Sequence, residues 1–346
     1  GGGGTGLGGG IPTSAEALAA WDRWVTATVR HFRGRVREWE IWNEPDLKRG
    51  LNPPEVFAEF HARTATIIRR EQTNAQIWAL ALAHDVTFAE RFLRRLAETG
   101  RTNLLDAITV HGYPANPDDL GLVQQVRKLA ARWAPHVAVL QGETGAPSTS
   151  NTFGALRGAY WSEHRQAKWN LRRLLAHRHA EVPIINLFTI ADLRYPSGWN
   201  TKGLLAMDDS LRPVRRKKAW HAAQHLFSTM DGRWSRVREF PWTASVATQL
   251  TVSAYRRADG GGDLVAIWIS AAPPAEEDTV VQLDLELPNA RFVEPVWLDF
   301  LTGEARAIPE GARSRCGAGW QFRGVPVYDA PVALADRTSL PLREEN

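Results

Sequence analysis

The fold is decided by the stretch at residues 39–46, WEIWNEPD, and by its later counterpart at residues 139–145, VLQGETG. In each stretch an apolar strand gives way to a glutamate beside residues that end the strand: Pro45 follows the first glutamate, and glycines flank the second. Proline cannot continue a central strand, and glycine lets the backbone turn sharply. Around these stretches, apolar strands alternate with amphipathic helices, which predicts a parallel sheet covered by helices.

The alternation of strands and helices extends from about residue 14 to residue 230. We expect strands at residues 36–43, 76–83, 107–111, 137–141 and 183–190, and helices at residues 14–32, 53–70, 87–99, 119–133, 158–179 and 213–230. A complete eight-stranded barrel needs about 250 residues, so this segment has room for five strand–helix units. The predicted fold class is therefore α/β, a (β/α)8 TIM-barrel type that is incomplete, with strands 4–8 present and the first three missing.

The sequence pattern changes at about residue 233. Short alternating segments at residues 250–258, 263–270, 280–287, 293–298 and 320–327 are separated by turn signals such as ADGGGD, LPNA and LTGE. This pattern is typical of a small antiparallel β-sandwich. We therefore expect a Gly-rich flexible start at residues 1–12, a partial barrel at residues 13–231 and a C-terminal sandwich at residues 232–346.

Composition excludes several classes of protein and site. The 346 residues are 44% hydrophobic and 23% charged, as in ordinary globular proteins. Cys316 is the only cysteine, so an intramolecular disulfide and a Cys-based metal cluster are both excluded. No apolar run reaches the roughly 20 residues of a membrane-spanning helix. The basic run RPVRRKK at residues 212–218 is interpreted as a solvated helix face, so we expect neither nucleic acid nor membrane as a partner.

The two glutamates at the strand ends form a pair suited to one reaction. Glu44 and Glu143 lie about a hundred residues apart, each at the carboxyl end of a predicted strand. That end of a barrel carries the active site. Glycoside hydrolysis needs one carboxylic acid to protonate the departing oxygen, and one carboxylate to attack the anomeric carbon or to activate water.

These motifs resemble a known clan of enzymes. The Asn-Glu-Pro at residues 43–45 and the Glu-Thr-Gly at residues 143–145 are similar to the strand-four and strand-seven motifs of retaining glycosidases with (β/α)8 barrels. Within that clan, the chain most resembles glycoside hydrolase family 39 and similar family 5-like bacterial enzymes. The segment at residues 203–226 resembles the last barrel strand and helix, and AIWIS, LDFLTGE and VPVYDAP resemble the accessory sandwich.

The resemblance implies a role for each matching residue. Glu44 is expected to be the acid/base and Glu143 the nucleophile, while Asn43 is expected to bind the sugar 2-hydroxyl. Further substrate-binding or positioning residues are expected at His111, Tyr113, Asp192 and Trp199. The implied substrate is an oligo- or polysaccharide with β-linked sugars, and neither a metal nor a cofactor is expected. The resemblance names neither the sugar nor exo or endo action.

Other interpretations stay open from the sequence. The chain is alternatively a non-catalytic carbohydrate-binding fragment or pseudoenzyme, in keeping with the missing strands. A metal-dependent barrel hydrolase would use His84, Asp85, His111 and Glu143, which all fall at strand ends. The open barrel edge predicts self-association. We expect the natural N-terminus to lie upstream, which leaves the compartment open, secreted and periplasmic locations included.

Overall fold

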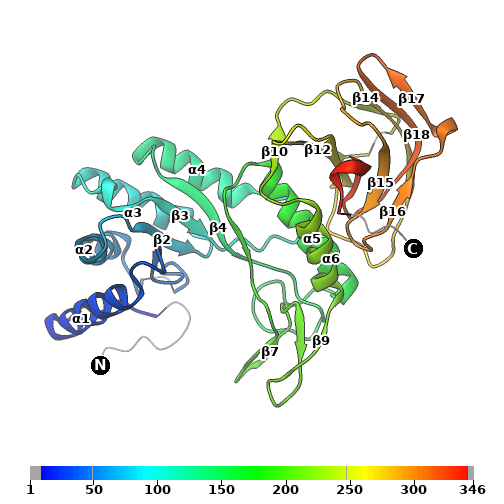
Figure 1. Cartoon of the computed structure of the whole chain (residues 1–346). Helices are drawn as coiled ribbons and strands as arrows, with labels where there is room; N and C mark the ends of the chain where they lie inside the picture. The colour runs from blue at the N-terminus through cyan, green and yellow to red at the C-terminus, as the bar shows by residue number, and fades with distance from the viewer. Residues whose placement is uncertain (1–8, 49, 247, 342–346) are drawn as a thin grey trace. The chain divides into compact units, whose positions relative to one another are not determined.

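The structure is a computed structural model that describes residues 9–48, 50–246 and 248–341. The expected Gly-rich start therefore lies outside the described residues as far as residue 8. The chain divides into two compact units (Figure 1). Described residues within 1–112, 120–144 and 182–186 form the first unit, and described residues within 113–119, 145–181 and 187–346 form the second. Helices that precede residue 231 thus share a unit with the C-terminal sheets, and the expected division into residues 13–231 and 232–346 stays a prediction.

The first unit is built on a five-stranded sheet in the order β1-β2-β3-β4-β5. Its strands are β1 (Glu38–Ile41), β2 (Gln76–Leu82), β3 (Ala107–Val110), β4 (Ala138–Thr144) and β5 (Ile185–Leu187). Strands β1 to β4 pair in parallel, each with the next one along the chain. This arrangement confirms the predicted parallel half-barrel, and it brings the carboxyl ends of β1, β3 and β4 to one edge of the sheet.

Four helices cover one face of this sheet (Figure 1). They are α1 (Ala15–Phe32), α2 (Pro54–Glu71), α3 (Val86–Glu98) and α4 (Gly121–Trp133), and each packs on the next. Their starts follow from local chemistry. The hydroxyl of Ser14 accepts a hydrogen bond from the Ala17 amide at 3.1 Å, and the carboxylate of Asp85 caps the first turn of α3.

The two faces of the sheet differ because successive strand residues point to opposite sides. Ile41, Ile77 and Ile108 are buried on the helix side. On the other face a shallow groove is lined by residues that include Glu38, Trp78 and Ile184. Glu38 is exposed, and so is Ile184. Part of the inner face, around Glu38 and Ile184, is therefore exposed, and β1 is the last strand at its edge of the sheet among the residues that the structure describes.

Among its described residues, the second unit has two α-helices and two small hairpins before the C-terminal sheets. The helices are α5 (Glu163–His179) and α6 (Lys218–Thr229). The hairpins pair β6 (Leu193–Tyr195) with β7 (Gly198–Asn200), and β8 (Leu205–Met207) with β9 (Pro213–Arg216).

Two predicted helix starts in this unit are wrong. The helix expected from residue 158 begins at Glu163, because Ser162 caps it by accepting a hydrogen bond from the Arg165 amide at 3.2 Å. The helix expected from residue 213 begins at Lys218. The basic residues before it form β9, whose side chains are all exposed, so most of the run RPVRRKK is a solvated strand and not a helix face.

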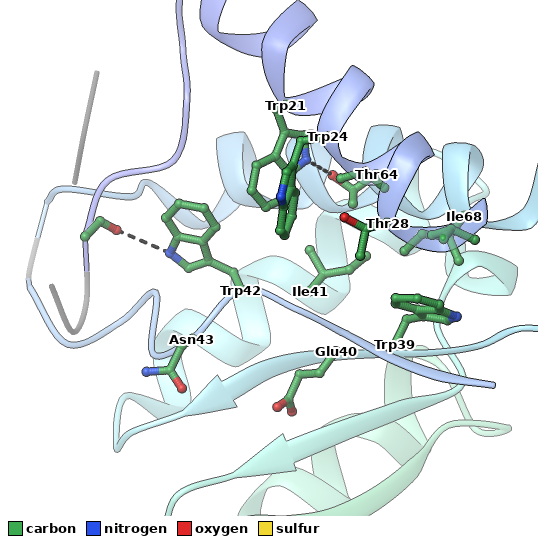
Figure 2. Close-up of a pocket in the computed structure, with 13 residues that line it drawn as sticks. Trp21, Trp24, Thr28, Trp39, Glu40, Ile41, Trp42, Asn43, Thr64 and Ile68 are labelled. Atoms are coloured by element: carbon green, nitrogen blue, oxygen red, sulfur yellow. Dashed lines mark hydrogen bonds between the residues drawn. The ribbon is translucent and has the colours of Figure 1, made fainter. Parts of the chain in front are cut away.

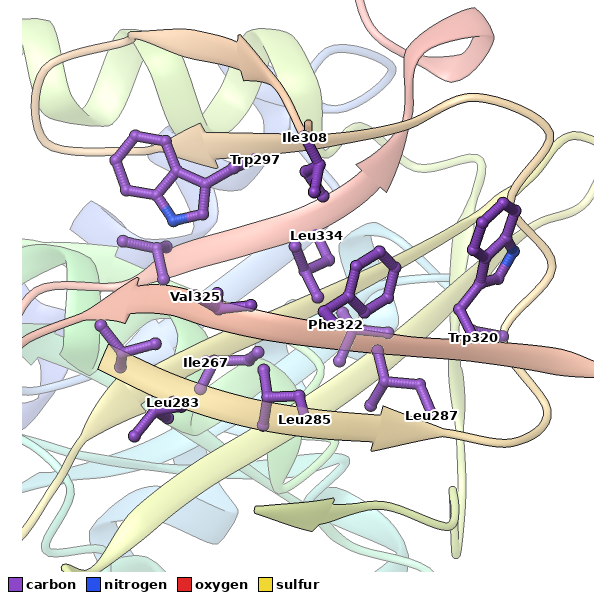
Figure 3. Packing of buried hydrophobic residues seen from close by; sticks show 14 of the residues in the cluster. Ile267, Leu283, Leu285, Leu287, Trp297, Ile308, Trp320, Phe322, Val325 and Leu334 are labelled. Carbon is purple, nitrogen blue, oxygen red and sulfur yellow. The ribbon is translucent and has the colours of Figure 1, made fainter. Parts of the chain in front are cut away.

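The C-terminal part forms two antiparallel sheets, as predicted. A six-stranded sheet has the order β10-β12-β13-β19-β15-β16, and a four-stranded sheet has the order β11-β14-β18-β17. The strands are β10 (Trp234–Val237), β11 (Thr243–Ala244), β12 (Leu250–Arg257), β13 (Asp263–Ile269), β14 (Val281–Leu287), β15 (Pro295–Asp299), β16 (Ala305–Ala307), β17 (Arg313–Cys316), β18 (Gly319–Val327) and β19 (Val332–Asp336). Figure 3 shows their apolar side chains meeting between the sheets, with Trp297 and Phe322 among them.

Helix α5 is tied to these sheets within the second unit. The ammonium of Lys168 is buried and lies 2.7 Å from the carboxylates of both Asp278 and Asp329. His179 at the end of the same helix lies 3.1 Å from the hydroxyl of Ser253. Trp268 of β13 is fully buried, and its indole N–H donates to the carboxylate of Asp118 at 2.6 Å.

Candidate active site

The loop that follows β1 carries Glu44 in an unusual backbone conformation. Trp42 has a φ of 69° and Glu44 a φ of 48°, in the left-handed region that non-glycine residues rarely adopt. Such a conformation costs of order 1–3 kcal/mol and persists only where the surroundings fix it. Strained residues cluster at functional sites, so the backbone at Glu44 marks this loop as a candidate for one.

Buried polar side chains hold the loop in place. The carboxylate of Asp46 accepts hydrogen bonds from the amides of Ala83, His84 and Asp85 at 2.8–2.9 Å, and so joins the loop after β1 to the loop after β2. The Asn52 side chain donates to the carbonyl of Pro45 at 3.1 Å. Both Asp46 and Asn52 are buried, where such bonds are costly to lose.

Glu143 lies near the end of β4, where side chains tie β4 to β3. The amide of Gln141 donates to the carbonyl of Val110 at 2.9 Å and to the carbonyl of Glu143 at 2.5 Å. One residue further, the hydroxyl of Thr144 donates to the carbonyl of Gly112 at 2.6 Å. The backbone of Glu143 is therefore held between two cross-strand contacts.

The structure brings three of the predicted residues together. The Nδ1 atom of His111 lies 2.9 Å from Oε1 of Glu44 and 3.7 Å from Oε2 of Glu143. One side-chain ligand atom from each of the three residues lies within 4.8 Å of the other two. The ring of His111 is nearly buried, with 3% of its side chain exposed, while Glu44 and Glu143 expose 12% and 26%.

The charge state of His111 follows from this arrangement. Burial of the ring disfavours its charged form, but the hydrogen bond with Glu44 and the attraction of Glu143, Glu44 and Glu40 outweigh burial and raise the pKa of His111 above its ordinary value. A protonated His111 donates its Nδ1 proton to Glu44 and partly offsets the repulsion between the two carboxylates.

Asn43, the residue before Glu44, lines a pocket of about 420 Å³ next to β1 (Figure 2). We call it the tryptophan pocket, because its walls include Trp21, Trp24, Trp39 and Trp42. The indole N–H of Trp21 donates to Thr64 at 3.0 Å, and that of Trp42 to the carbonyl of Gly9 at 3.3 Å. The proposed contact of Asn43 with a sugar hydroxyl stays a prediction.

The other predicted substrate residues belong to the second unit. The ring of Tyr113 lies 5.5 Å from the ammonium of Lys202, and Trp199 on β7 lies 5.9 Å from the guanidinium of Arg194. Asp192 is buried, and its Oδ1 atom accepts hydrogen bonds from Lys217 at 2.6 Å and from the Gly203 amide at 3.0 Å. The carboxylate of Asp192 therefore has a structural partner, and its predicted contact with substrate stays untested.

Glu44, His111 and Glu143 also form the one group with the spacing of metal ligands among the residues that the structure describes. His84 and Asp85, which the metal-dependent alternative would use, are not part of it. His84 exposes 68% of its side chain and lies 3.8 Å from Asp46 instead. A direct hydrogen bond joins His111 to Glu44 within the group, so the arrangement is complete as a proton-sharing triad.

Sequence reasoning missed the residues that support the site. Asp46 follows the Asn-Glu-Pro motif directly, and this position was the only sign of its role in the sequence. The structure shows that Asp46 is buried, unlike an ordinary loop aspartate. Glu40 and Thr109 were missed because their contact depends on how β1, β2 and β3 are aligned. Their hydroxyl–carboxylate hydrogen bond joins two strands far apart in sequence.

Comparisons with known proteins agree with the fold. No protein-family model and no curated protein sequence matches this chain. Solved structures do match it. A glucosidase from Croceicoccus marinus has a TM-score of 0.53 and 16% identity, over 92% of this chain and 74% of its own. A family 44 xyloglucanase from Paenibacillus polymyxa has a TM-score of 0.59 and 12% identity, over 91% and 69%.

A family 51 α-L-arabinofuranosidase from Thermotoga petrophila has a TM-score of 0.59 and 12% identity, over 94% of this chain and 73% of its own. The fold of this chain is thus similar to the folds of these three glycoside hydrolases. At these identities the likeness concerns the fold alone, and the predicted resemblance to family 39 and family 5-like enzymes stays a prediction.

Proposed function

We propose that this chain is the catalytic part of a retaining glycoside hydrolase that cleaves the O-glycosidic bonds of β-linked sugars in oligo- or polysaccharides. The observation that carries the proposal is the approach of the Glu44 and Glu143 carboxylates, with ligand atoms within 4.8 Å, at the carboxyl ends of parallel strands. Retaining glycosidases hold their two carboxyl groups about 5–5.5 Å apart, whereas inverting enzymes need about 6.5–9.5 Å to admit a water molecule.

In the first step, Glu143 attacks the anomeric carbon while Glu44 protonates the glycosidic oxygen. The carbon–oxygen bond to the leaving group breaks as the bond to the Glu143 carboxylate forms, which gives a glycosyl ester. Because Oε1 of Glu44 accepts a hydrogen bond from His111, the proton to be transferred is placed on the other oxygen, Oε2.

In the second step, the carboxylate of Glu44 removes a proton from water, which attacks the same carbon and releases Glu143. Two displacements at one carbon restore its original configuration. The protonated His111 stays beside both carboxylates throughout, and it stabilises whichever of them is charged.

The proposal competes with a non-catalytic carbohydrate-binding chain. A chain that only binds sugar has no use for two close carboxylates, nor for strained backbone at Glu44 held by buried hydrogen bonds. These features favour catalysis. The metal-dependent alternative is disfavoured because the histidine and aspartate it would use at residues 84 and 85 lie outside the triad.

Azide rescue of two variants tests the roles of the two glutamates. Each variant is assayed on aryl β-glycosides of glucose, xylose and galactose and on aryl α-L-arabinofuranosides. Glu143→Ala is expected to lose turnover on all of them, and azide should then yield a glycosyl azide of inverted configuration. Glu44→Ala is expected to keep activity on activated aryl leaving groups, and azide should yield a retained product.

The matched control for these variants is Glu98→Gln, which changes an exposed glutamate at the end of α3. It should behave like the unmodified chain. If Glu143→Ala hydrolysed any of these substrates at the unmodified rate, the assignment of the nucleophile would be wrong. Active substrates in the panel also name the sugar and test the β-linkage.

A further inference from the structure

A third carboxylate lies on the same strand as the catalytic loop. Glu40 belongs to β1, one residue after Trp39, and the alternation of strand side chains turns these two in opposite directions. Figure 2 shows Trp39 toward Ile68 of α2, and Glu40 on the other side of the strand. Glu40 thus faces the inner side of the half-barrel, four residues before Glu44.

Thr109 of β3 holds the Glu40 carboxylate. Its hydroxyl donates to Oε1 of Glu40 and accepts a hydrogen bond from the amide of Ala81 at 3.0 Å. An accepted amide proton orients the hydroxyl, so that its own proton points at Glu40. Thr109 is buried, with 1% of its surface exposed, and lies two residues before His111, which directly follows the end of β3.

The backbone of β2 is irregular at the point where it meets Thr109. The pairing of β2 with β3 shifts register between Ala79 and Leu82, and Leu80 and Ala81 have φ values of 78° and 40°. Regular pairing would use the Ala81 amide within the ladder. The bulge turns it toward the Thr109 side chain instead, which is a common use of bulges beside functional sites.

Gly142 on β4, the other strand that pairs with β3, leaves room for the Thr109 side chain. A Cβ atom at Gly142 would lie 2.8 Å from Cβ of Thr109 and 3.2 Å from its hydroxyl oxygen. Glycine is therefore required one residue before Glu143 if Thr109 is to keep this position. The bulge in β2 and the glycine in β4 thus both accommodate the Thr109–Glu40 hydrogen bond. This hydrogen bond has no role in the two-step reaction described above.

We propose that Glu40, anchored by Thr109, is a positioning residue of the reaction: its negative charge keeps His111 protonated, so that His111 keeps donating to Glu44. The proposal rests on the proposed glycosidase function. The charged groups that act on His111 are Glu40 from β1, Glu44 from the loop after β1 and Glu143 from β4. From β2 the contact is with backbone, since the His111 amide donates to the Leu82 carbonyl at 2.8 Å.

Two neighbours of Glu40 oppose the effect of burial on its charge. Loss of hydration around its carboxylate raises the pKa of Glu40, although the side chain as a whole is exposed. The hydrogen bond from Thr109 and the attraction of His111 oppose this rise, and the repulsion of Glu143 adds to it. Thr109 and His111 thus favour the charged form of Glu40, which in turn favours the charged form of His111.

The test measures His111 directly and then the reaction. The titration of His111 is followed by NMR of the isotope-labelled chain in the unmodified form and in Glu40→Gln, which keeps the shape and removes the charge. We expect the pKa of His111 to fall by about 0.5–1 unit, less than the 1–3 units that an opposite charge in direct contact produces. The alkaline limb of the pH–rate profile should shift down by the same amount.

Three further variants separate positioning from folding. Thr109→Val removes the hydroxyl and should shift the pH profile in the same direction, whereas Thr109→Ser keeps the hydroxyl and should restore the profile of the unmodified chain. Glu38→Gln is the matched control, because Glu38 lies two residues earlier on the same face of β1. It should leave both the His111 titration and the pH profile unchanged.

The outcomes distinguish the two proposals. If the unmodified chain is active and Glu40→Gln changes neither the His111 titration nor the pH profile, the role of Glu40 is overturned. If the chain hydrolyses no glycoside but Glu40→Gln still lowers the pKa of His111, the glycosidase function is overturned while the effect of Glu40 on His111 is supported. An equal shift in Glu38→Gln would overturn the specific role of Glu40.

Discussion

Replacing Lys217 with methionine breaks a buried ion pair in the second unit. Lys217 is 2% exposed, and its ammonium donates to Asp192 at 2.6 Å and to the hydroxyl of Ser148 at 2.8 Å. Methionine keeps the apolar stem and removes the charge, which leaves the Asp192 carboxylate buried without its counter-ion. Removing one partner of a buried pair costs about 3–5 kcal/mol, so we expect Lys217→Met to lower the free energy of unfolding by about that amount.

The cost should depend on pH with a definite sign. Burial raises the pKa of Asp192, and the hydrogen bond and charge of Lys217 oppose that rise. Without Lys217 the pKa rises further above the unfolded value, so the folded state binds a proton that the unfolded chain does not. The free energy of unfolding of Lys217→Met then falls as pH rises through the folded pKa. The loss should be smaller at about pH 5 than at about pH 8.

Urea unfolding followed by tryptophan fluorescence and circular dichroism measures both effects. Lys218→Met is the matched control, since Lys218 is the next residue and is exposed, and its effect should stay within about 0.5 kcal/mol. The double variant Asp192→Asn with Lys217→Met should recover part of the loss because it removes the unpaired charge. A loss below about 1 kcal/mol, or a loss that does not grow with pH, would refute this account of the pair.

Three further outcomes follow from the structure. Burial lowers the pKa of His61 from 6.5 to about 4, so between these pH values His61 is neutral in the folded state and protonated in the unfolded chain. The free energy of unfolding should therefore fall by about 3 kcal/mol as pH drops across that window. A His61→Gln variant should lack this pH dependence. Activity should survive EDTA, and loss of activity that Zn²⁺ restores would contradict the proposed mechanism. Strand β1 lies at the edge of the described sheet, and Trp24 beside it is 58% exposed. The chain should therefore self-associate as its concentration rises in sedimentation experiments, and Trp24→Gln should weaken the self-association. A monomer at every concentration would contradict this prediction.

The parallel half-barrel was predictable because its strands are short apolar runs that end at Pro45 and at the glycines around Glu143. Periodicity also located the helices, since their apolar faces repeat at helical spacing. It failed at residues 213–216, where exposed residues pair as β9 and no apolar face marks the element. It also missed β19 at residues 332–336, VALAD, in which all five residues are buried and no polar residue alternates with the apolar ones.

The two glutamates of the proposed catalytic pair could be located from the sequence, but the residues that hold them in place could not. Glu44 and Glu143 each lie in a short motif that is visible in the local sequence. Glu40 and Thr109 are separated by 69 residues, and their contact depends on the bulge at Leu80 and Ala81, which no local pattern signals. The ion pair of Asp192 with the buried Lys217 was not predictable either, because it joins residues 25 positions apart in the sequence. The contact of Asp192 with substrate stays a prediction.

The central claim is that Glu44 and Glu143 act as a retaining pair, and the configuration of the first-formed sugar tests it most directly. Proton NMR follows the anomeric signal during the first turnovers on the best aryl glycoside of the panel, before mutarotation mixes the two anomers. The account predicts that the first sugar released has the anomeric configuration of the substrate. A first product of inverted configuration would contradict the double displacement and the role of Glu143 as nucleophile.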